Sequence, residues 1–159
     1  MNEARQEHKL IARRKRNTIE RPRLQSLGEQ ILGHQVTAIV APAGYGKTVF
    51  VASLLEEPGW PPTAWYSLEK SDAQPYNFLY NLIQALKEIY PDFGRDSLRT
   101  LKSLENFTRE WPIAVKALVQ EMPREPRSVL IVDDLHLVFE NEVVAAIIEY
   151  LLQHLPENL

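Results

Sequence analysis

The feature that most constrains this chain is an apolar run that ends at a glycine-containing loop. Residues 36–41 (VTAIVA) are β-prone and apolar almost throughout, the pattern of a strand buried on both faces. The loop at 42–46 (PAGYG) follows at once, and the helix-compatible segment 47–55 comes next. The order predicts a strand, a tight loop and a helix.

The loop carries a phosphate-binding pattern. Residues 41–48 (APAGYGKT) fit G-x-x-x-x-G-K-[ST], except that Ala41 stands at the first glycine. Gly44 and Gly46 allow backbone N–H groups to point at phosphate oxygens, beside the positive end of the following helix. Lys47 can contact the β and γ phosphates, and Thr48 can ligate Mg²⁺. The nucleotide contacts predicted here are Ala43, Gly44, Tyr45, Gly46, Lys47, Thr48 and Val49.

The alternative interpretation of this loop is a glycine turn that carries an exposed lysine. The predicted strand before it and the predicted helix after it favour the phosphate loop, because the pattern needs both.

Two acids supply the second half of such a site. The apolar segment 128–132 (SVLIV) predicts another buried strand, and Asp133 and Asp134 follow it. Asp133 can hold the Mg²⁺ shell, and Asp134 can orient or deprotonate the attacking water. The alternative is an ordinary turn or cap residue at a strand end. No Asn-Lys-x-Asp tetrad is present in the sequence, which favours adenine over guanine.

The remaining pattern alternates strands with helices. A strand is predicted at 63–68, Asp72 is expected to cap a helix running to Ile89, Pro112 is expected in the first turn of another, and Asn141 is expected to cap the last. This alternation predicts an α/β fold with a parallel sheet sandwiched by helices.

Composition narrows the class further. The chain has no cysteine, which excludes a disulfide framework and thiolate metal sites, and its 159 residues suffice for one core of ordinary size. No apolar stretch approaches the ~20 residues that span a bilayer, and no secretory signal is expected, so the cytoplasm is the predicted location.

The net charge of -3 is unevenly placed. Residues 1–23 hold eight Lys/Arg against three acids, a local +5, which leaves -8 for the rest. We therefore expect a basic arm over residues 1–20 and one domain over residues 21–159. Such an arm is more often a solvated tail than a nucleic-acid contact.

Three segments carry a family resemblance: APAGYGKT, AWYSLEKSDAQP leading into FLYNLIQAL, and VLIVDDLHLV. Together they resemble the nucleotide-binding domain of the MalT-like STAND ATPases, the ATP-dependent branch of LuxR-type bacterial transcription regulators. Ala41 is compatible with this family, whose loop begins with a small residue.

The resemblance implies roles for individual residues. Lys47 and Thr48 would bind phosphate and Mg²⁺, Asp133 would hold the metal shell, and Asp134 would act on water. His136 matches a histidine that often follows the paired acids, and the element 21–23 (RPR) matches a segment that touches adenine.

The resemblance also implies a P-loop NTPase-like switch between ADP-bound and self-associating ATP-bound states. The family's next strand is expected just after Leu159, so the fold would be incomplete at the C-terminus, and DNA would be bound only through domains outside this sequence. Nucleotide binding is expected to be weakened and hydrolysis slow. The alternatives are an AAA+-like or DNA-transaction ATPase, and an interaction module whose nucleotide site is idle.

Overall fold

The structure is a computed structural model that describes residues 27–42 and 44–159. The chain divides into two compact units, whose described parts are 27–61, apart from residue 43, and 62–159. The predicted basic arm at 1–20 and the predicted adenine-side element at 21–23 lie outside the described residues.

The larger unit is built on two parallel strands. β1 (Thr63–Ser67) and β2 (Val129–Asp133) are hydrogen-bonded neighbours, and their register places Ser67 beside Asp133. Parallel strands need a long crossover connection, and the helices between β1 and β2 provide it. The described residues therefore confirm an α/β fold with a parallel sheet flanked by helices.

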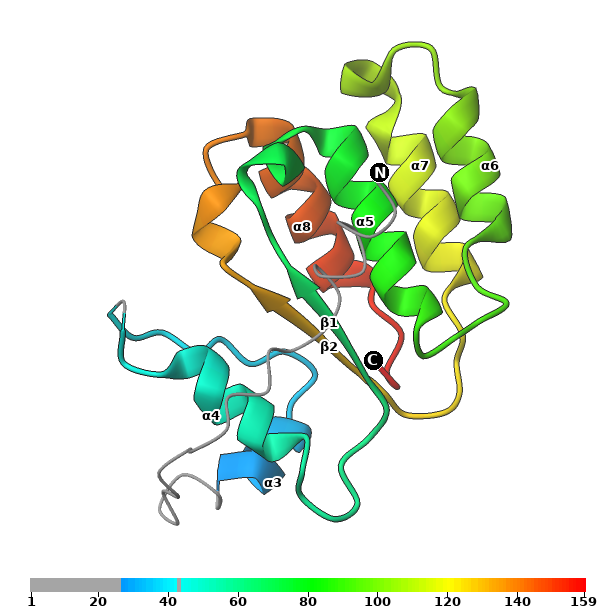
Figure 1. Ribbon diagram of the computed structural model, residues 1–159. Coiled ribbons are helices and arrows are strands. Elements are labelled where there is room, and N and C mark those ends of the chain that lie inside the picture. Colours follow the sequence, from blue (N-terminus) through cyan, green and yellow to red (C-terminus); the bar gives the residue numbers. More distant parts are fainter. Residues whose placement is uncertain (1–26, 43) are drawn as a thin grey trace, which may run out of the picture. The chain divides into compact units, whose positions relative to one another are not determined.

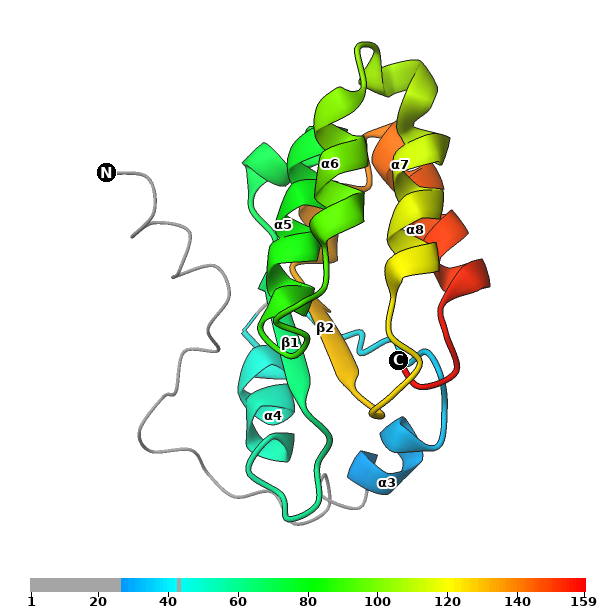
Figure 2. The same ribbon diagram turned by 90° about the vertical axis from the view of Figure 1, so that its right-hand side faces the viewer.

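Within residues 62–159, four helices accompany this sheet. They are α5 (Pro75–Lys87), α6 (Arg95–Ser103), α7 (Phe107–Glu121) and α8 (Glu142–His154). α5 packs on β1, α7 lies against both α5 and α8, and α6 packs on α7 (Figures 1 and 2). Short 3-10 helices follow each strand: η1 (Lys70–Ala73) comes after β1, and η2 (Leu135–Leu137) comes after β2.

The core of the larger unit lies under one face of β1. Ala64, Tyr66 and Leu68 alternate along the chain, as a strand requires for side chains on one face, and all three are buried. The apolar faces of the helices close over them, with Leu82, Val115, Ile147 and their neighbours almost fully buried.

The smaller unit contains α3 (Leu27–Leu32) and α4 (Lys47–Leu54). The prediction of a buried strand at 36–41 is wrong: this segment is neither strand nor helix, and Val36 and Val40 are 50% and 91% exposed. A strand is stable only when a neighbour pairs with it, and the sheet of the described residues consists of β1 and β2 alone. The apolar run has a composition that favours a strand, but no strand of the described residues pairs with it.

Two predicted helix starts are also wrong. α5 begins at Pro75, after Gln74, and Asp72 lies instead in η1, where it forms a reciprocal cap with Glu69. Pro112 lies inside α7 rather than in its first turn, because the helix begins earlier, at Phe107.

The predicted cap of α8 is confirmed. The Asn141 side chain accepts hydrogen bonds from the backbone N–H groups of Val143 and Val144, at 3.0 and 3.1 Å. These bonds satisfy two of the first N–H groups of α8, which have no partner within the helix.

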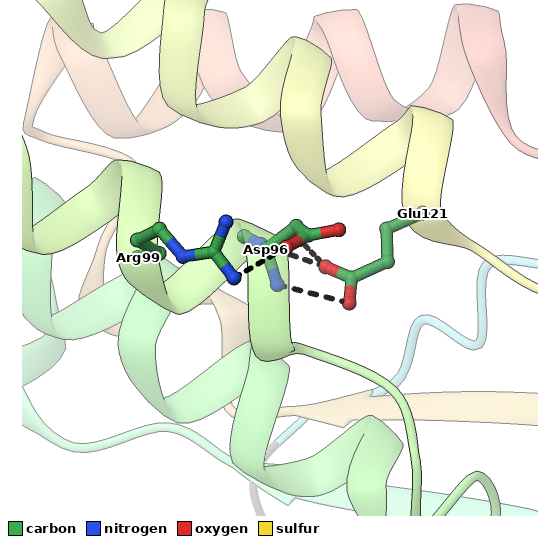
Figure 3. Close-up of polar contacts among 4 residues, drawn as sticks. Asp96, Arg99 and Glu121 are labelled. Carbon is green, nitrogen blue, oxygen red and sulfur yellow. Dashed lines mark hydrogen bonds and ion pairs between the residues drawn. The ribbon is translucent and has the colours of Figure 1, made fainter.

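Glu121 closes the start of a neighbouring helix. Its carboxylate accepts hydrogen bonds from the backbone N–H groups of Asp96 (3.2 Å) and Ser97 (2.7 Å), and from the Ser97 hydroxyl. Figure 3 shows it facing the first turn of α6, where Asp96 also pairs with Arg99 at 3.0 Å. The residue before α6 is Gly94, which has no side chain to cap the helix. Glu121 therefore does this from α7.

Glu121 is expected to make stability depend on pH. Burial raises its pKa, but the hydrogen bonds from Ser97 and Asp96 outweigh burial, and the net pKa lies below the ordinary value. The stabilisation is therefore present above the pKa of the unfolded chain and is lost as pH falls through the folded pKa. We expect Glu121→Gln to cost about 1 kcal/mol at pH 7, moderated by partial exposure, and progressively less as the pH falls through the lowered pKa of Glu121.

Urea denaturation at pH 7 and at a series of lower pH values measures this change. Glu105→Gln is the matched control, because Glu105 is exposed between α6 and α7. Equal losses from the two substitutions at pH 7 would contradict the assigned cap.

Candidate functional site

The phosphate loop owes its shape to two glycines. Gly44 and Gly46 have φ values of 82° and 78°, in the left-handed region that L side chains rarely adopt. An added Cβ at either position would meet nothing within 4 Å, so the requirement for glycine is conformational rather than steric. Gly46 stands directly before α4 and has no side chain to cap it. The first turn of α4 therefore presents backbone N–H groups beside the loop, as an anion site requires.

Lys47 folds back over this loop. Its ammonium donates to the carbonyl oxygens of Ala41 at 2.6 Å and Pro42 at 3.2 Å. An ammonium has three N–H donors, so these two bonds hold the charge at the loop with one donor remaining for an anion, counting partners among the described residues. The positive charge and the loop backbone thus lie together, within one unit.

The other predicted contacts of the loop are placed as follows. Tyr45 is 69% exposed between the two glycines, Thr48 is the exposed second residue of α4, and Val49 is half-buried behind it. Ala43 lies outside the described residues. The short helix α4 thus begins at the lysine and carries the hydroxyl of Thr48 in its first turn.

The paired acids lie in the larger unit, at the carboxyl end of β2. Asp133 is the last residue of the strand, and its carboxylate accepts the backbone N–H of Asp134 at 2.9 Å. Its carbonyl oxygen accepts from Leu68 at 3.1 Å, so the residue after β1 also holds this strand end. In parallel sheets ligands bind at this end of the strands, which is where the sequence placed the two acids.

Asp134 has an unusual backbone. Its φ of 58° and ψ of 35° are left-handed, and it is the one non-glycine residue with positive φ in the described part of the chain. Asp tolerates this region better than most residues, but the conformation still stores strain, which folds retain mainly at functional sites. This geometry turns the chain into η2, and the Leu137 N–H donates to the Asp134 carbonyl at 3.0 Å. Sequence reasoning missed it, because nothing in Asp-Asp signals a left-handed residue.

His136 follows on the same turn. Its Nδ1 lies 3.9 Å from an Asp134 carboxylate oxygen, and the two side chains are 74% and 57% exposed. A contact at that distance between exposed groups contributes little to stability. His136 therefore lies near Asp134 but does not hold its side chain in place.

The two predicted metal ligands, one in each unit, offer oxygen atoms of the kind that Mg²⁺ binds. No group of three or more His, Cys, Asp or Glu side chains that could hold an ion by itself occurs in residues 27–42 and 44–159. Mg²⁺ commonly binds through one or two protein oxygens together with substrate phosphates. A hydroxyl such as that of Thr48 and a carboxylate such as that of Asp133 have the required chemistry.

Comparison with known proteins assigns the class. The AAA domain family matches residues 31–158, which is most of the chain and includes both the loop and the paired acids. The chain belongs to this family, and its architecture is that of a P-loop ATPase domain. None of the helices in the described residues is long and apolar enough to cross a membrane.

The similarity extends to particular regulators. The HTH-type transcriptional regulator MalT of Vibrio campbellii is 27% identical over 143 residues, which cover 90% of this chain and 15% of that protein. MalT of Serratia proteamaculans is 31% identical over 146 residues, covering 92% of this chain and 16% of that protein. The domain is therefore MalT-like, and the chain spans about one sixth of the length of these relatives.

The left-handed turn gives a stability prediction. Asp134→Ala and Asp134→Gly both remove the carboxylate, but only glycine adopts positive φ without strain. We expect Asp134→Ala to be less stable than Asp134→Gly by about 1 kcal/mol, a gap narrowed by the greater flexibility of glycine in the unfolded chain. Thermal and urea unfolding of the two variants measure it. If the Asp134→Ala variant proves as stable as the Asp134→Gly variant, the left-handed backbone assigned to position 134 would be contradicted.

Proposed function

We propose that this chain is the nucleotide-binding switch module of a bacterial transcription regulator and that it binds Mg-ATP and ADP. The observation that carries the proposal is the loop at 41–48. Two left-handed glycines lead into α4, and the Lys47 ammonium is already held over the same backbone. A plain turn needs neither the paired glycines nor a lysine folded inward.

In this proposal, backbone N–H groups at 44–48 donate hydrogen bonds to the phosphate oxygens, and the N-terminus of α4 adds its positive potential. Lys47 directs its remaining N–H donor at the β and γ phosphates, and Ala43, Tyr45 and Val49 contribute backbone contacts. Thr48 and Asp133 hold Mg²⁺, which neutralises charge on the phosphates. Each assignment uses a group whose chemistry suits its role.

We assign the hydrolytic step to Asp134. Its carboxylate is exposed, next to the metal-shell residue, and a left-handed backbone fixes the direction of the turn that carries it. A carboxylate there can accept a proton from the attacking water. Hydrolysis is slow in this proposal, which suits a switch whose ATP state must persist long enough to be read.

The regulatory part of the proposal comes from the relatives. Their names describe HTH-type transcriptional regulators, and this chain corresponds to a small part of them. We therefore infer that the nucleotide state acts on self-association or on other domains of the same regulator, of LuxR type, and that DNA contacts belong to those domains. A second candidate is an ATPase that acts directly on DNA, because the AAA domain match assigns an ATPase domain without assigning what it acts on.

Nucleotide binding is expected to depend on Lys47. Loss of a charge-assisted contact costs about 1.5–3 kcal/mol, so Lys47→Ala should weaken binding of fluorescent ATP and ADP by roughly tenfold or more. Lys102→Ala is the matched control, because Lys102 is an exposed lysine on α6. Equal affinity of the Lys47→Ala variant and the wild type, both folded by circular dichroism, would refute the phosphate loop as the binding site.

Hydrolysis is expected to depend on Asp134. Asp134→Asn keeps a residue that tolerates positive φ but removes the base, so single-turnover hydrolysis of labelled ATP should fall about a hundredfold while binding persists. The same assay with added duplex DNA separates the two candidates. Stimulation of turnover by DNA would favour the DNA-transaction ATPase, and an unchanged rate in the Asp134→Asn variant would remove Asp134 from the mechanism.

A further inference from the structure

Asp72 is a buried acid that the proposed mechanism does not use. It is 0% exposed, in the short helix η1 that follows β1. One carboxyl oxygen accepts the backbone N–H of Glu69 at 2.7 Å, and the other accepts the side-chain amide of Asn81 at 2.7 Å. These partners belong to the start of η1 and to the middle of α5. A buried carboxyl group is costly unless it is hydrogen-bonded in this way.

Tyr66 brings β1 into the same network. Its hydroxyl donates to the Phe78 carbonyl of α5 at 3.3 Å, and the side chain is 0% exposed. Burial first, and then the adjacent Asp72 carboxyl group, hold the pKa of Tyr66 well above its ordinary value. Asp72 thus lies where β1, η1 and α5 meet, and it ties the segment after β1 to the helix behind it.

The segment that Asp72 ties down borders the paired acids. Ser67 lies beside Asp133 in the sheet, and the next residue, Leu68, donates its N–H to the Asp133 carbonyl. Further along, η1 lies against η2, the short helix that Asp134 begins. The turn that carries Asp133 and Asp134, called the acidic turn below, therefore packs against η1, and Asp72 fixes the conformation of η1.

We propose that Asp72 is the positioning residue for the Asp133–Asp134 turn, acting through η1 and without touching a ligand. An apolar side chain could fill the same space, and replacing both partners of a buried hydrogen bond by apolar groups of the same shape can be nearly neutral for stability. An apolar residue could not accept the hydrogen bonds from Glu69 and Asn81. It would therefore not fix how the segment after β1 is held against α5. We call the two hydrogen bonds of Asp72 the Asp72 brace. Its effect on binding of Mg-nucleotide rests on the proposed function, whereas its effect on the position of the turn does not.

The test compares Asp72→Asn with the exchanged pair Asp72→Asn/Asn81→Asp. The single substitution leaves one acceptor oxygen at position 72, so Asn81 can stay bonded only by rotating its amide, and the bond then joins two neutral groups and is weaker. The exchanged pair restores one carboxylate and one amide in mutual contact, and the new amide oxygen at position 72 can still accept from the Glu69 N–H. Glu121→Gln is the matched control, since it loosens α6 in the same unit without touching this network.

Hydrogen–deuterium exchange of the folded 159-residue chain is the first measurement. We expect exchange at residues 134–138 to accelerate about tenfold in Asp72→Asn and at 95–121 by less than about twofold, with the exchanged pair close to wild type. The control should show the opposite pattern. Unchanged exchange at 134–138, equal acceleration in both regions, or no recovery in the exchanged pair would overturn the proposal.

Nucleotide affinity with and without Mg²⁺ is the second measurement. We expect the gain in affinity that Mg²⁺ gives to shrink several-fold in Asp72→Asn, while Mg²⁺-free affinity stays near that of the wild type, because Lys47 and its loop lie in the other unit. An unchanged Mg²⁺ gain in Asp72→Asn would overturn the positioning role. A wild type that binds no nucleotide would refute the proposed function, and the exchange pattern would then decide the positioning role alone.

Discussion

The parallel pairing of β1 with β2 is the interaction on which the larger unit depends. It fixes Ser67 beside Asp133, and the segments that follow the two strands must therefore leave the sheet together. The contact between η1 and η2 follows from this register, as does the hydrogen bond from Leu68 to Asp133. A shift of one residue would move every side chain of a strand to the other face of the sheet, so the buried positions of Ala64 and Tyr66 also hold the register.

Much of the local structure could be predicted because its determinants lie close together in the sequence. The helix after Gly46, the strand at 63–67 and the Asn141 cap each depend on a few adjacent residues, and the structure has them with small shifts at the ends. Local signals also misled where two of them competed. Asp72 resembles the cap of α5, yet Pro75 sets the start of that helix, and Asp72 caps η1 instead.

What could not be predicted depends on contacts that are distant in sequence. The run at 36–41 has the composition of a strand, but composition cannot supply a pairing partner, and among the described residues it has none. Glu121 is 25 positions from Asp96 and 24 from Ser97, the residues whose N–H groups it caps. The contacts of Asp72 likewise form only once β1 and α5 have packed together. For the candidate site, the sequence therefore indicated which residues to consider, while the left-handed Asp134 and the support behind it required the fold.

This difference between local and distant determinants bears on what the chain can do. The phosphate loop is formed by glycine conformations, a helix start and a lysine that bonds to its own loop, all within residues 41–50. It keeps this form although the preceding run is not a strand, so the conformation of the loop does not require a paired strand before it. The acidic turn instead depends on register, on η1 and on a buried carboxyl group from another segment. Under the proposed function, affinity for phosphate and the response to Mg²⁺ are therefore separable, and loss of distant contacts should impair the second before the first.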